Sequence, residues 1–251
     1  MTTPQTPFQP AVDEIADGIY RISTLIPDVG PEGFTFNQFL VDADEPLLFH
    51  TGMRVLFPLV SEAVATVVPV ESLRWISFGH VEADESGSMN MWLAAAPNSQ
   101  VAFGALGCDV SLNDLCDRPP RVLEAGEVID LGGKRVRQIS TPHVPHGWEA
   151  QVLYEETTGT LLCGDLLSQT GAPPALVTTD VLEAALAAEA MFGSTCLAPH
   201  TGQVLRGLGD LQPTTLAIMH GSSFQGDCAT VLYDMAGAYE ALIAGAMVTP
   251  R

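Results

Sequence analysis

Four short segments of this sequence carry residue types that bind metal ions. The first is the run HVEADE at residues 80–85, in which one imidazole and two carboxylates occur at alternate positions. In an extended backbone alternate side chains point the same way, so His80, Glu82 and Asp84 would face one side. Three polar side chains on one face of a buried strand end need a partner, which a cation can supply. The run therefore predicts a metal site.

The other three segments each follow a predicted strand. They are TPHVPHGW at residues 141–148, CGD at residues 163–165 and MHGS at residues 219–222. Loops that leave strand ends converge at one edge of a layered α/β fold, while the sheet holds them in place. We therefore expect four of their side chains to lie near the first run: His143, His146, Asp165 and His220.

Periodicity and turn signals predict the elements that position these residues. Helices are expected over residues 55–67 and 89–96 and over most of the last third of the chain. Strands are expected over residues 18–23, 36–41, 47–49, 73–78, 100–103, 134–139, 151–154, 160–163 and 215–219. Two packed sheets with helices outside would bury this many apolar strands. We expect a polar leader over residues 1–14 and a single four-layered α/β domain over residues 15–251.

The composition excludes several classes of protein. The 251 residues include 30 Asp and Glu against 10 Lys and Arg, a formal net charge of −20, so the chain has no basic surface for nucleic acid. No stretch approaches the roughly 18 to 20 apolar residues of a membrane span, and the N-terminus lacks the features of a signal peptide. Five scattered cysteines favour buried thiols in a reducing compartment. We therefore expect a cytoplasmic protein with no nucleic-acid or membrane partner.

The sequence resembles the metallo-β-lactamase superfamily and, within it, the flavodiiron branch. Four runs carry the resemblance, in the order FGHVEADESGS, TPHVPHGW, GDLLS and MHGSSF, and it extends from about residue 15 to residue 240. These runs are most similar to those of the stand-alone oxygen-binding diiron proteins, the ODP family. The resemblance implies a single-domain, four-layered αββα metallo-β-lactamase-like sandwich.

The resemblance also implies a diiron centre with six protein ligands. It places His80, Glu82 and His146 on one iron, Asp84 and His220 on the other, and Asp165 between them together with an oxo, hydroxo or peroxo group. By this resemblance the ligand in the second segment would be His146 and not His143. The family's histidine lies 19 residues before its bridging aspartate, and here 165 − 146 = 19.

The roles of other polar and aromatic residues stay open at this point. Relatives often have a histidine where this chain has Glu85. Glu85 is therefore an additional ligand, an outer partner of a ligand or a solvated acid at a helix start. His143 is either an outer partner of a ligand or a loop residue. Trp148 and Phe224 are either pocket walls or core aromatics, and we expect His50 and His200 to be packing residues.

The donor set favours iron over zinc. Three carboxylates and two Fe(II) leave a net charge of 4 − 3 = +1, and hard oxygen ligands favour the higher oxidation state. A zinc hydrolase would more usually keep a histidine where Glu82 stands.

We therefore expect a non-haem diiron protein that binds O₂ or NO. It would act as an oxygen sensor or carrier, or as an oxidoreductase that depends on a separate electron-donor protein, with no flavin in this chain. One alternative is a dinuclear zinc hydrolase acting on a thioester, lactone or phosphoester, and another is a signalling module without turnover. The oligomeric state is left open, a homodimer included.

Overall fold

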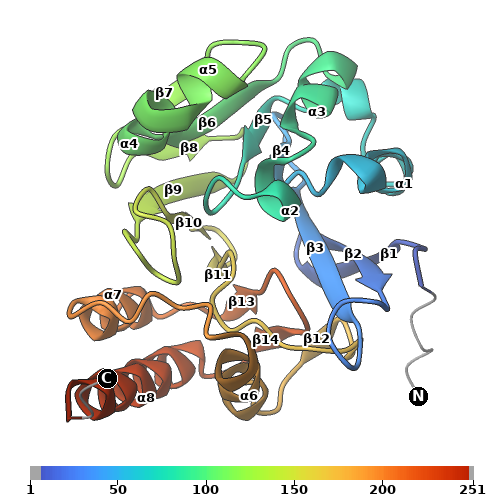
Figure 1. Cartoon of the computed structure of the whole chain (residues 1–251). Helices are drawn as coiled ribbons and strands as arrows, with labels where there is room; N and C mark the ends of the chain where they lie inside the picture. The colour runs from blue at the N-terminus through green and yellow to red at the C-terminus, as the bar shows by residue number, and fades with distance from the viewer. Residues whose placement is uncertain (1–6, 249–251) are drawn as a thin grey trace.

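Two mixed β-sheets lie face to face at the centre of the molecule, and helices cover both outer faces (Figure 1). The computed structural model describes residues 7–248. Within that range each sheet has seven strands. The predicted four-layered αββα arrangement is confirmed, and the chain forms a single domain.

The first sheet is built from the N-terminal half of the chain in sequential order. Its strands pair antiparallel from β1 to β4 and parallel from β4 to β7. The strands are β1 (Ala11–Ala16), β2 (Ile19–Ile26), β3 (Phe34–Val41), β4 (Leu47–Phe49), β5 (Trp75–Ser77), β6 (Gln100–Gly104) and β7 (Arg121–Leu123).

The second sheet has the order β12-β14-β13-β11-β10-β9-β8. The pairs β11–β13 and β12–β14 are parallel and the other neighbours are antiparallel. The strands are β8 (Val128–Asp130), β9 (Arg135–Ser140), β10 (Gln151–Glu155), β11 (Thr160–Leu162), β12 (Leu176–Val177), β13 (Thr215–Ala217) and β14 (Ser223–Gln225).

The helices fall into two sets, one on each outer face (Figure 1). On the first sheet lie α1 (Phe57–Val64), α2 (Ala83–Ser86), α3 (Met89–Ala95), α4 (Ala105–Gly107) and α5 (Asn113–Leu115), with short turns η1 (Arg54–Leu56), η2 (Val70–Ser72) and η3 (Cys108–Leu112). On the second sheet lie α6 (Leu182–Phe192), α7 (Thr201–Gly209) and α8 (Cys228–Val248). No helix within residues 7–248 has both the length and the apolarity to cross a bilayer.

Three apolar layers hold the four structural layers together. The central layer lies between the sheets, where Phe39 and Phe49 of the first sheet and Leu153 and Leu162 of the second are buried in one cluster. The outer layers pack α1 and α3 on the first sheet, and α6, α7 and α8 on the second. Each Å² of apolar surface removed from water contributes about 25 cal/mol, so this packing is the main source of stability.

Each predicted strand overlaps an observed one, but several strands were not predicted. The missed strands are short or lie at sheet edges: β1, β7, β8, β12 and β14. Strand β1 pairs with β2 along its length, so residues 11–14 belong to the sheet and not to a leader. The remainder of the expected leader, residues 1–6, lies outside the described residues.

Backbone hydrogen bonds tie the two sheets together at the edge where the four motifs emerge. The N–H of Gln151, at the start of β10, donates to the carbonyl of Gly79 just after β5 at 2.8 Å. The N–H of Asn37 in β3 donates to the carbonyl of Met219 just after β13 at 3.0 Å. The loops of the two sheets are therefore held at fixed positions relative to each other.

Candidate metal centre

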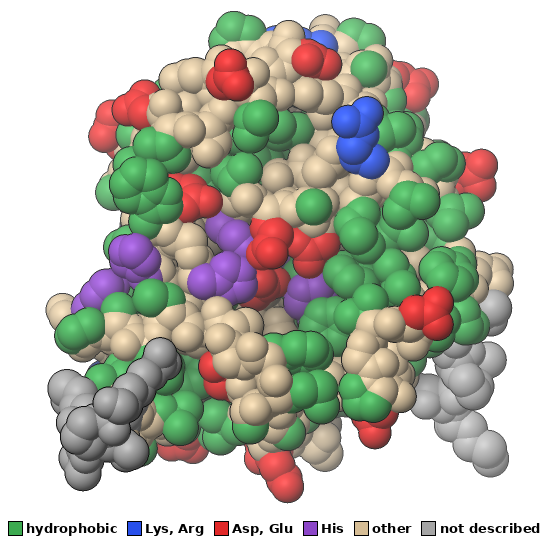
Figure 2. All heavy atoms as spheres, viewed as in Figure 1, with side chains coloured by type: hydrophobic (Ala, Val, Ile, Leu, Met, Phe, Trp, Pro, Cys, Tyr) green, Lys and Arg blue, Asp and Glu red, His purple; other side chains and the backbone are tan. Residues whose placement is uncertain are grey.

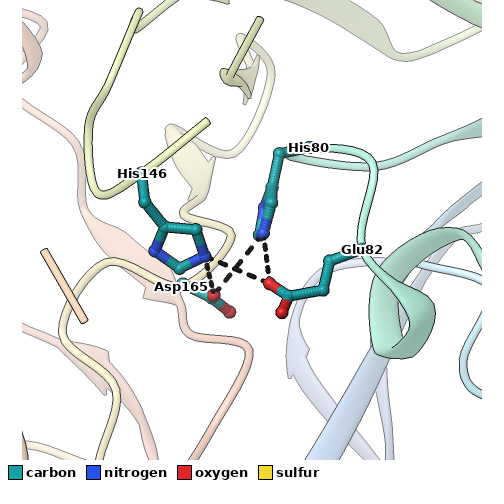
Figure 3. A group of neighbouring side chains, drawn as sticks. All are labelled: His80, Glu82, His146 and Asp165. Atoms are coloured by element: carbon teal, nitrogen blue, oxygen red, sulfur yellow. Dashed lines mark hydrogen bonds and ion pairs between the residues drawn. The ribbon is translucent and has the colours of Figure 1, made fainter. Parts of the chain in front are cut away.

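Four candidate ligands from three separate loops point toward one another (Figure 3). The shortest contact joins His80 Nε2 to Glu82 Oε2 at 2.7 Å, and His146 Nε2 lies 3.1 Å from the same oxygen. His146 Nε2 also lies 3.4 Å from Asp165 Oδ2. All four ligand atoms lie within 4.8 Å of one another, so one metal ion could contact all of them.

A second group shares Asp165 with the first. His220 Nε2 lies 3.4 Å from Asp84 Oδ2 and 3.2 Å from Asp165 Oδ1. The two oxygens of Asp165 thus face different groups, Oδ2 the first and Oδ1 the second. A carboxylate with its oxygens divided in this way is suited to bridge two cations.

The first motif does not stay extended, which corrects the expectation that its three side chains face one side. Glu82 is extended, with φ −130° and ψ 159°, but α2 begins at Ala83. Asp84 therefore lies in the first turn of a helix, where successive side chains turn by about 100° instead of alternating. His80 and Glu82 enter the first group, whereas Asp84 reaches the second.

The outer nitrogens of two candidate ligand histidines are held by acceptors. His220 Nδ1 donates to the backbone carbonyl of Thr35 at 2.8 Å, and His80 Nδ1 lies 3.3 Å from Glu85 Oε1. Because these contacts hold a proton on Nδ1, Nε2 is the nitrogen free to bind a cation. His146 Nδ1 is buried and has no hydrogen-bond partner among the described residues.

Glu85 lies behind His80, on the side away from the two groups. It is fully buried, and its Oε2 accepts a hydrogen bond from the His80 backbone N–H at 2.7 Å. Its Oε1 lies near both His80 Nδ1 and His50 Nε2, the latter at 3.4 Å. A Cβ atom on Gly79 would come within 2.9 Å of this carboxylate, so the glycine leaves it room. Of the roles open for Glu85, the structure favours the outer partner of a ligand.

Charges in the two groups perturb the titration of their members strongly. Burial lowers the pKa of His80, but Glu85, Glu82 and Asp165 outweigh it and raise the value to about 12. Burial also lowers the pKa of His220, but the contacts with Asp165 and Asp84 outweigh it and raise the value to about 10.

The carboxylates shift in the opposite direction. Burial raises the pKa of Asp165, but the contact with His220 and the neighbouring imidazoles lower it to about 2. Hydrogen bonds with His146 and His80 lower the pKa of Glu82, and the same contact with Glu82 raises that of His146. Without a cation, protons on His80 and His220 therefore offset part of the carboxylate charge at neutral pH.

The other predicted residues lie away from the two groups. His143 lies against His200, with ring centroids 6.0 Å apart, and the His200 ring hydrogen-bonds the carbonyl of Pro142. Trp148 is exposed, while Phe224 is buried in the apolar layer beneath α6 and α8. Neither aromatic residue lines the pocket at the two groups. His50 is buried, as expected of a packing residue, but it also contacts Glu85.

A pocket of about 390 Å³ opens beside the two groups. Figure 2 shows histidine and acidic side chains gathered at the centre of the viewed face, bordered by hydrophobic ones. Beyond Glu82, Asp84, His146, Asp165 and His220, the pocket is lined by Val29, Phe34, Leu167, Ser168, Ala185, Ala188, Glu189, Phe192, Ser194, Thr195, Met235 and Tyr239. Leu167 and Ser168 lie in the GDLLS run. Sequence reasoning missed the other ten because no local motif marks them and they come from segments far apart in the chain.

The donor set fits two metal ions. Three imidazoles and three carboxylates converge without a cysteine, and Asp165 Oδ1 is a buried oxygen with no hydrogen-bond partner of good geometry. Hard oxygen donors together with imidazole suit iron, manganese or zinc. That these residues bind metal stays a prediction.

The fold is metallo-β-lactamase-like, as in the core of flavodiiron proteins. The family described as "ODP family beta lactamase" matches residues 34–220. The chain belongs to this family.

Similar structures show the same fold. A flavoprotein from Thermotoga maritima superposes with a TM-score of 0.79, covering 95% of this chain and 62% of that chain at 19% identity. The flavodiiron protein from Giardia intestinalis gives a TM-score of 0.77, covering 94% of this chain and 60% of that chain at 14% identity.

Two curated relatives match over about half of this chain. Diflavin flavoprotein A 1 of Nostoc sp. is 29% identical over 137 residues, which are 53% of this chain and 23% of that protein. Rubredoxin-oxygen oxidoreductase of Megalodesulfovibrio gigas is 22% identical over 143 residues, which are 56% of this chain and 35% of that protein. The chain thus spans only a minor part of the length of either relative.

Proposed function

We propose that this chain holds two iron ions and binds O₂ or NO at them. The observation that carries the proposal is Asp165, whose two oxygens face two separate groups of candidate ligands. His80, Glu82 and His146 would complete the first iron site, and Asp84 and His220 the second. When bound, two ferrous ions can supply two electrons to a diatomic ligand.

The second site has fewer candidate protein ligands than the first. It has three candidate donors, whereas the first has four. His220 is held from behind by Thr35, and the rings of Phe34 and Phe36 lie 4.3 Å and 5.1 Å from the imidazole. The buried Phe36 ring packs against His220, while Phe34 lines the pocket that gives a diatomic ligand access to the second site.

The pocket lining argues against the hydrolysis of phosphoesters. No Lys or Arg is among the pocket-lining residues of the described chain. A phosphoester carries negative charge, which hydrolytic sites usually match with Arg or Lys as well as metal. This supports redox chemistry ahead of phosphoester hydrolysis.

Repeated turnover would need electrons from outside this chain. The relative from Megalodesulfovibrio gigas is named for rubredoxin and oxygen. We therefore propose O₂ as a ligand and a separate protein as electron donor. Without such a donor, the chain would act as an oxygen sensor or oxygen carrier. All five cysteines are free thiols, which supports a reducing compartment such as the cytoplasm.

Metal analysis followed by an anaerobic oxygen titration tests the proposal. Protein expressed with iron should contain about two irons per chain, and the reduced form should gain a visible charge-transfer band on exposure to O₂. A parallel titration with NO compares the two ligands. Consumption of O₂ with an added reductant would identify an oxidoreductase, and its absence a sensor or carrier. A featureless spectrum with iron fully loaded, or two zincs with esterase activity, would overturn the proposal.

A further inference from the structure

The pocket beside the candidate metal centre is much larger than a diatomic ligand requires. Its volume is about 390 Å³. A water molecule takes about 30 Å³ in the liquid, so a molecule of similar size fills about a tenth of the space. Sites for small organic ligands measure about 300–1,000 Å³. The volume therefore suits an organic molecule.

Most of the wall beyond the metal centre is apolar. Helix α6 contributes the buried residues Ala185 and Ala188, whose small side chains leave the space open. Phe34 extends the wall from the metal centre, because its ring stacks on His220 at 4.3 Å and meets the edge of Phe192 at 5.7 Å. Such a wall offers ring faces and edges to an aromatic ligand.

A network of hydroxyl groups forms the polar part of the wall. The Glu189 carboxylate accepts hydrogen bonds from the Thr195 N–H at 3.1 Å, the Thr195 hydroxyl at 2.7 Å and the Ser194 hydroxyl at 3.3 Å. The Thr195 hydroxyl also donates to the Tyr239 phenol oxygen, 3.1 Å away, so Glu189 and Tyr239 share its proton. The Tyr239 oxygen keeps a free lone pair, which can accept a hydrogen bond from a ligand.

The charges around the pocket select against ionised ligands. No Lys or Arg in the described chain lines it, so an anion would meet no counter-charge from the side chains. With two divalent metal ions bound, the four carboxylates that line the pocket would leave a net charge of 4 − 4 = 0: Glu82, Asp84, Asp165 and Glu189. A cation therefore gains little, and an uncharged hydrogen-bond donor fits best.

We propose that this pocket binds a small, uncharged organic molecule with an apolar, ring-containing body and one hydroxyl or N–H group. The selection against charged ligands rests on two bound metal ions, and the position of this ligand beside bound O₂ rests on the proposed function. This organic molecule would lie in the pocket beside the metal centre and would be distinct from the diatomic ligand.

Fluorescence titration of the metal-loaded full chain with 2-naphthol tests the proposal. We expect saturable binding of one molecule per chain and at least tenfold weaker binding of naphthalene-2-sulfonate, which has the same ring system and a negative charge. Equal affinity for the two probes, or no saturable binding of 2-naphthol, would overturn the proposal.

Two matched substitutions on α6 locate the bound probe. Ala188→Phe fills the pocket and should reduce the affinity for 2-naphthol at least tenfold. Ala187→Phe makes the same change on the exposed face of the helix and should leave the affinity unchanged. Equal affinities in the two variants would place the probe elsewhere and refute the assignment. If Ala188→Phe does not fold, Tyr239→Phe decides, with a severalfold loss expected and an unchanged affinity counting against the proposal.

The titration is repeated on protein loaded with zinc, which separates the two proposals. Binding of 2-naphthol to either form, without an O₂-dependent band in the iron form, would leave the pocket assignment standing while the proposed function fails. An O₂-dependent band without 2-naphthol binding would support the proposed function and overturn the pocket assignment.

Discussion

Replacing Glu85 with glutamine should weaken metal binding without altering any of the six candidate ligands. The carboxylate accepts the His80 backbone N–H at 2.7 Å through one oxygen and lies 3.3 Å from His80 Nδ1 through the other. Glutamine has one acceptor oxygen and one NH₂ group. In either orientation, the NH₂ group faces an N–H of His80, which leaves a buried donor without an acceptor.

The size of the effect follows from the loss of one of two contacts to a metal-binding histidine. Changes to such outer partners typically reduce metal affinity about 10–100-fold, or about 1.4–2.7 kcal/mol. We expect a loss in this range at the His80 site and a smaller one at the His220 site, which Glu85 does not contact. Anaerobic Fe(II) titration against a competing chelator measures both steps.

Two further variants make the test specific to the Glu85 contact. Glu62→Gln removes the same charge from an exposed position on α1 and should leave metal affinity unchanged. Gly79→Ala keeps the Glu85 charge but places a Cβ within 2.9 Å of the carboxylate, so it should also weaken binding at the His80 site. Wild-type affinity in Glu85→Gln, equal to that of Glu62→Gln, would refute the outer-partner role.

Three other predictions follow from the same geometry. Asp165→Asn should lose most of both metals, because its oxygens face both groups; metal analysis showing two metals retained in this variant, but lost in His220→Ala, would contradict the shared role. Metal loading at pH 7 should release protons from His80 and His220, whose pKa values of about 12 and 10 keep them protonated, so apparent affinity should rise with pH. Calorimetry in buffers of different ionisation enthalpy measures this release, and no buffer dependence would count against it. Phe78→Ala, at a fully buried ring packed 4.9 Å from Phe103, should lower the free energy of unfolding by about 3–5 kcal/mol in urea titrations, and a loss below about 1 kcal/mol would contradict that packing.

The same pKa shifts give the metal-free protein a pH window of stability. The pKa of His220 is raised from 6.5 to about 10, so its stabilising contribution is complete below about pH 6.5 and is lost as pH rises through 10. The pKa of Asp165 is lowered from 3.8 to about 2, so its contribution is present above about pH 3.8 and is lost as pH falls through 2. Thermal melts of metal-free protein should show the highest stability between these limits. A melting temperature that still rises above pH 10 would contradict the His220 assignment.

Much of the fold was predictable because apolar strands are marked by local patterns. Buried strands such as β4 and β6 are formed mainly by short apolar runs, and they were expected at nearly their observed positions. Edge strands such as β1 and β12 are half-exposed, so their sequences carry a weaker signal. Their pairing depends on a neighbouring strand, which no local window contains.

The sequence by itself determined which residue types gather at the strand ends and in what order. His80, Glu82, Asp165 and His220 could be selected because each lies in a short run at the end of a predicted strand, whereas His146 was chosen over His143 by the resemblance. The family could be inferred from the same runs, and the match over residues 34–220 confirms it.

Only the tertiary structure decided which way these side chains point and what surrounds them. Asp84 joins His220 because the chain turns into a helix at Ala83, and Glu85 turns to the back of His80 because that helix carries it into the protein interior. Glu189 and Tyr239 reach the pocket only when α6 and α8 pack on the second sheet. Side-chain direction depends on the local turn and on the packing of distant segments, and a short sequence motif specifies neither.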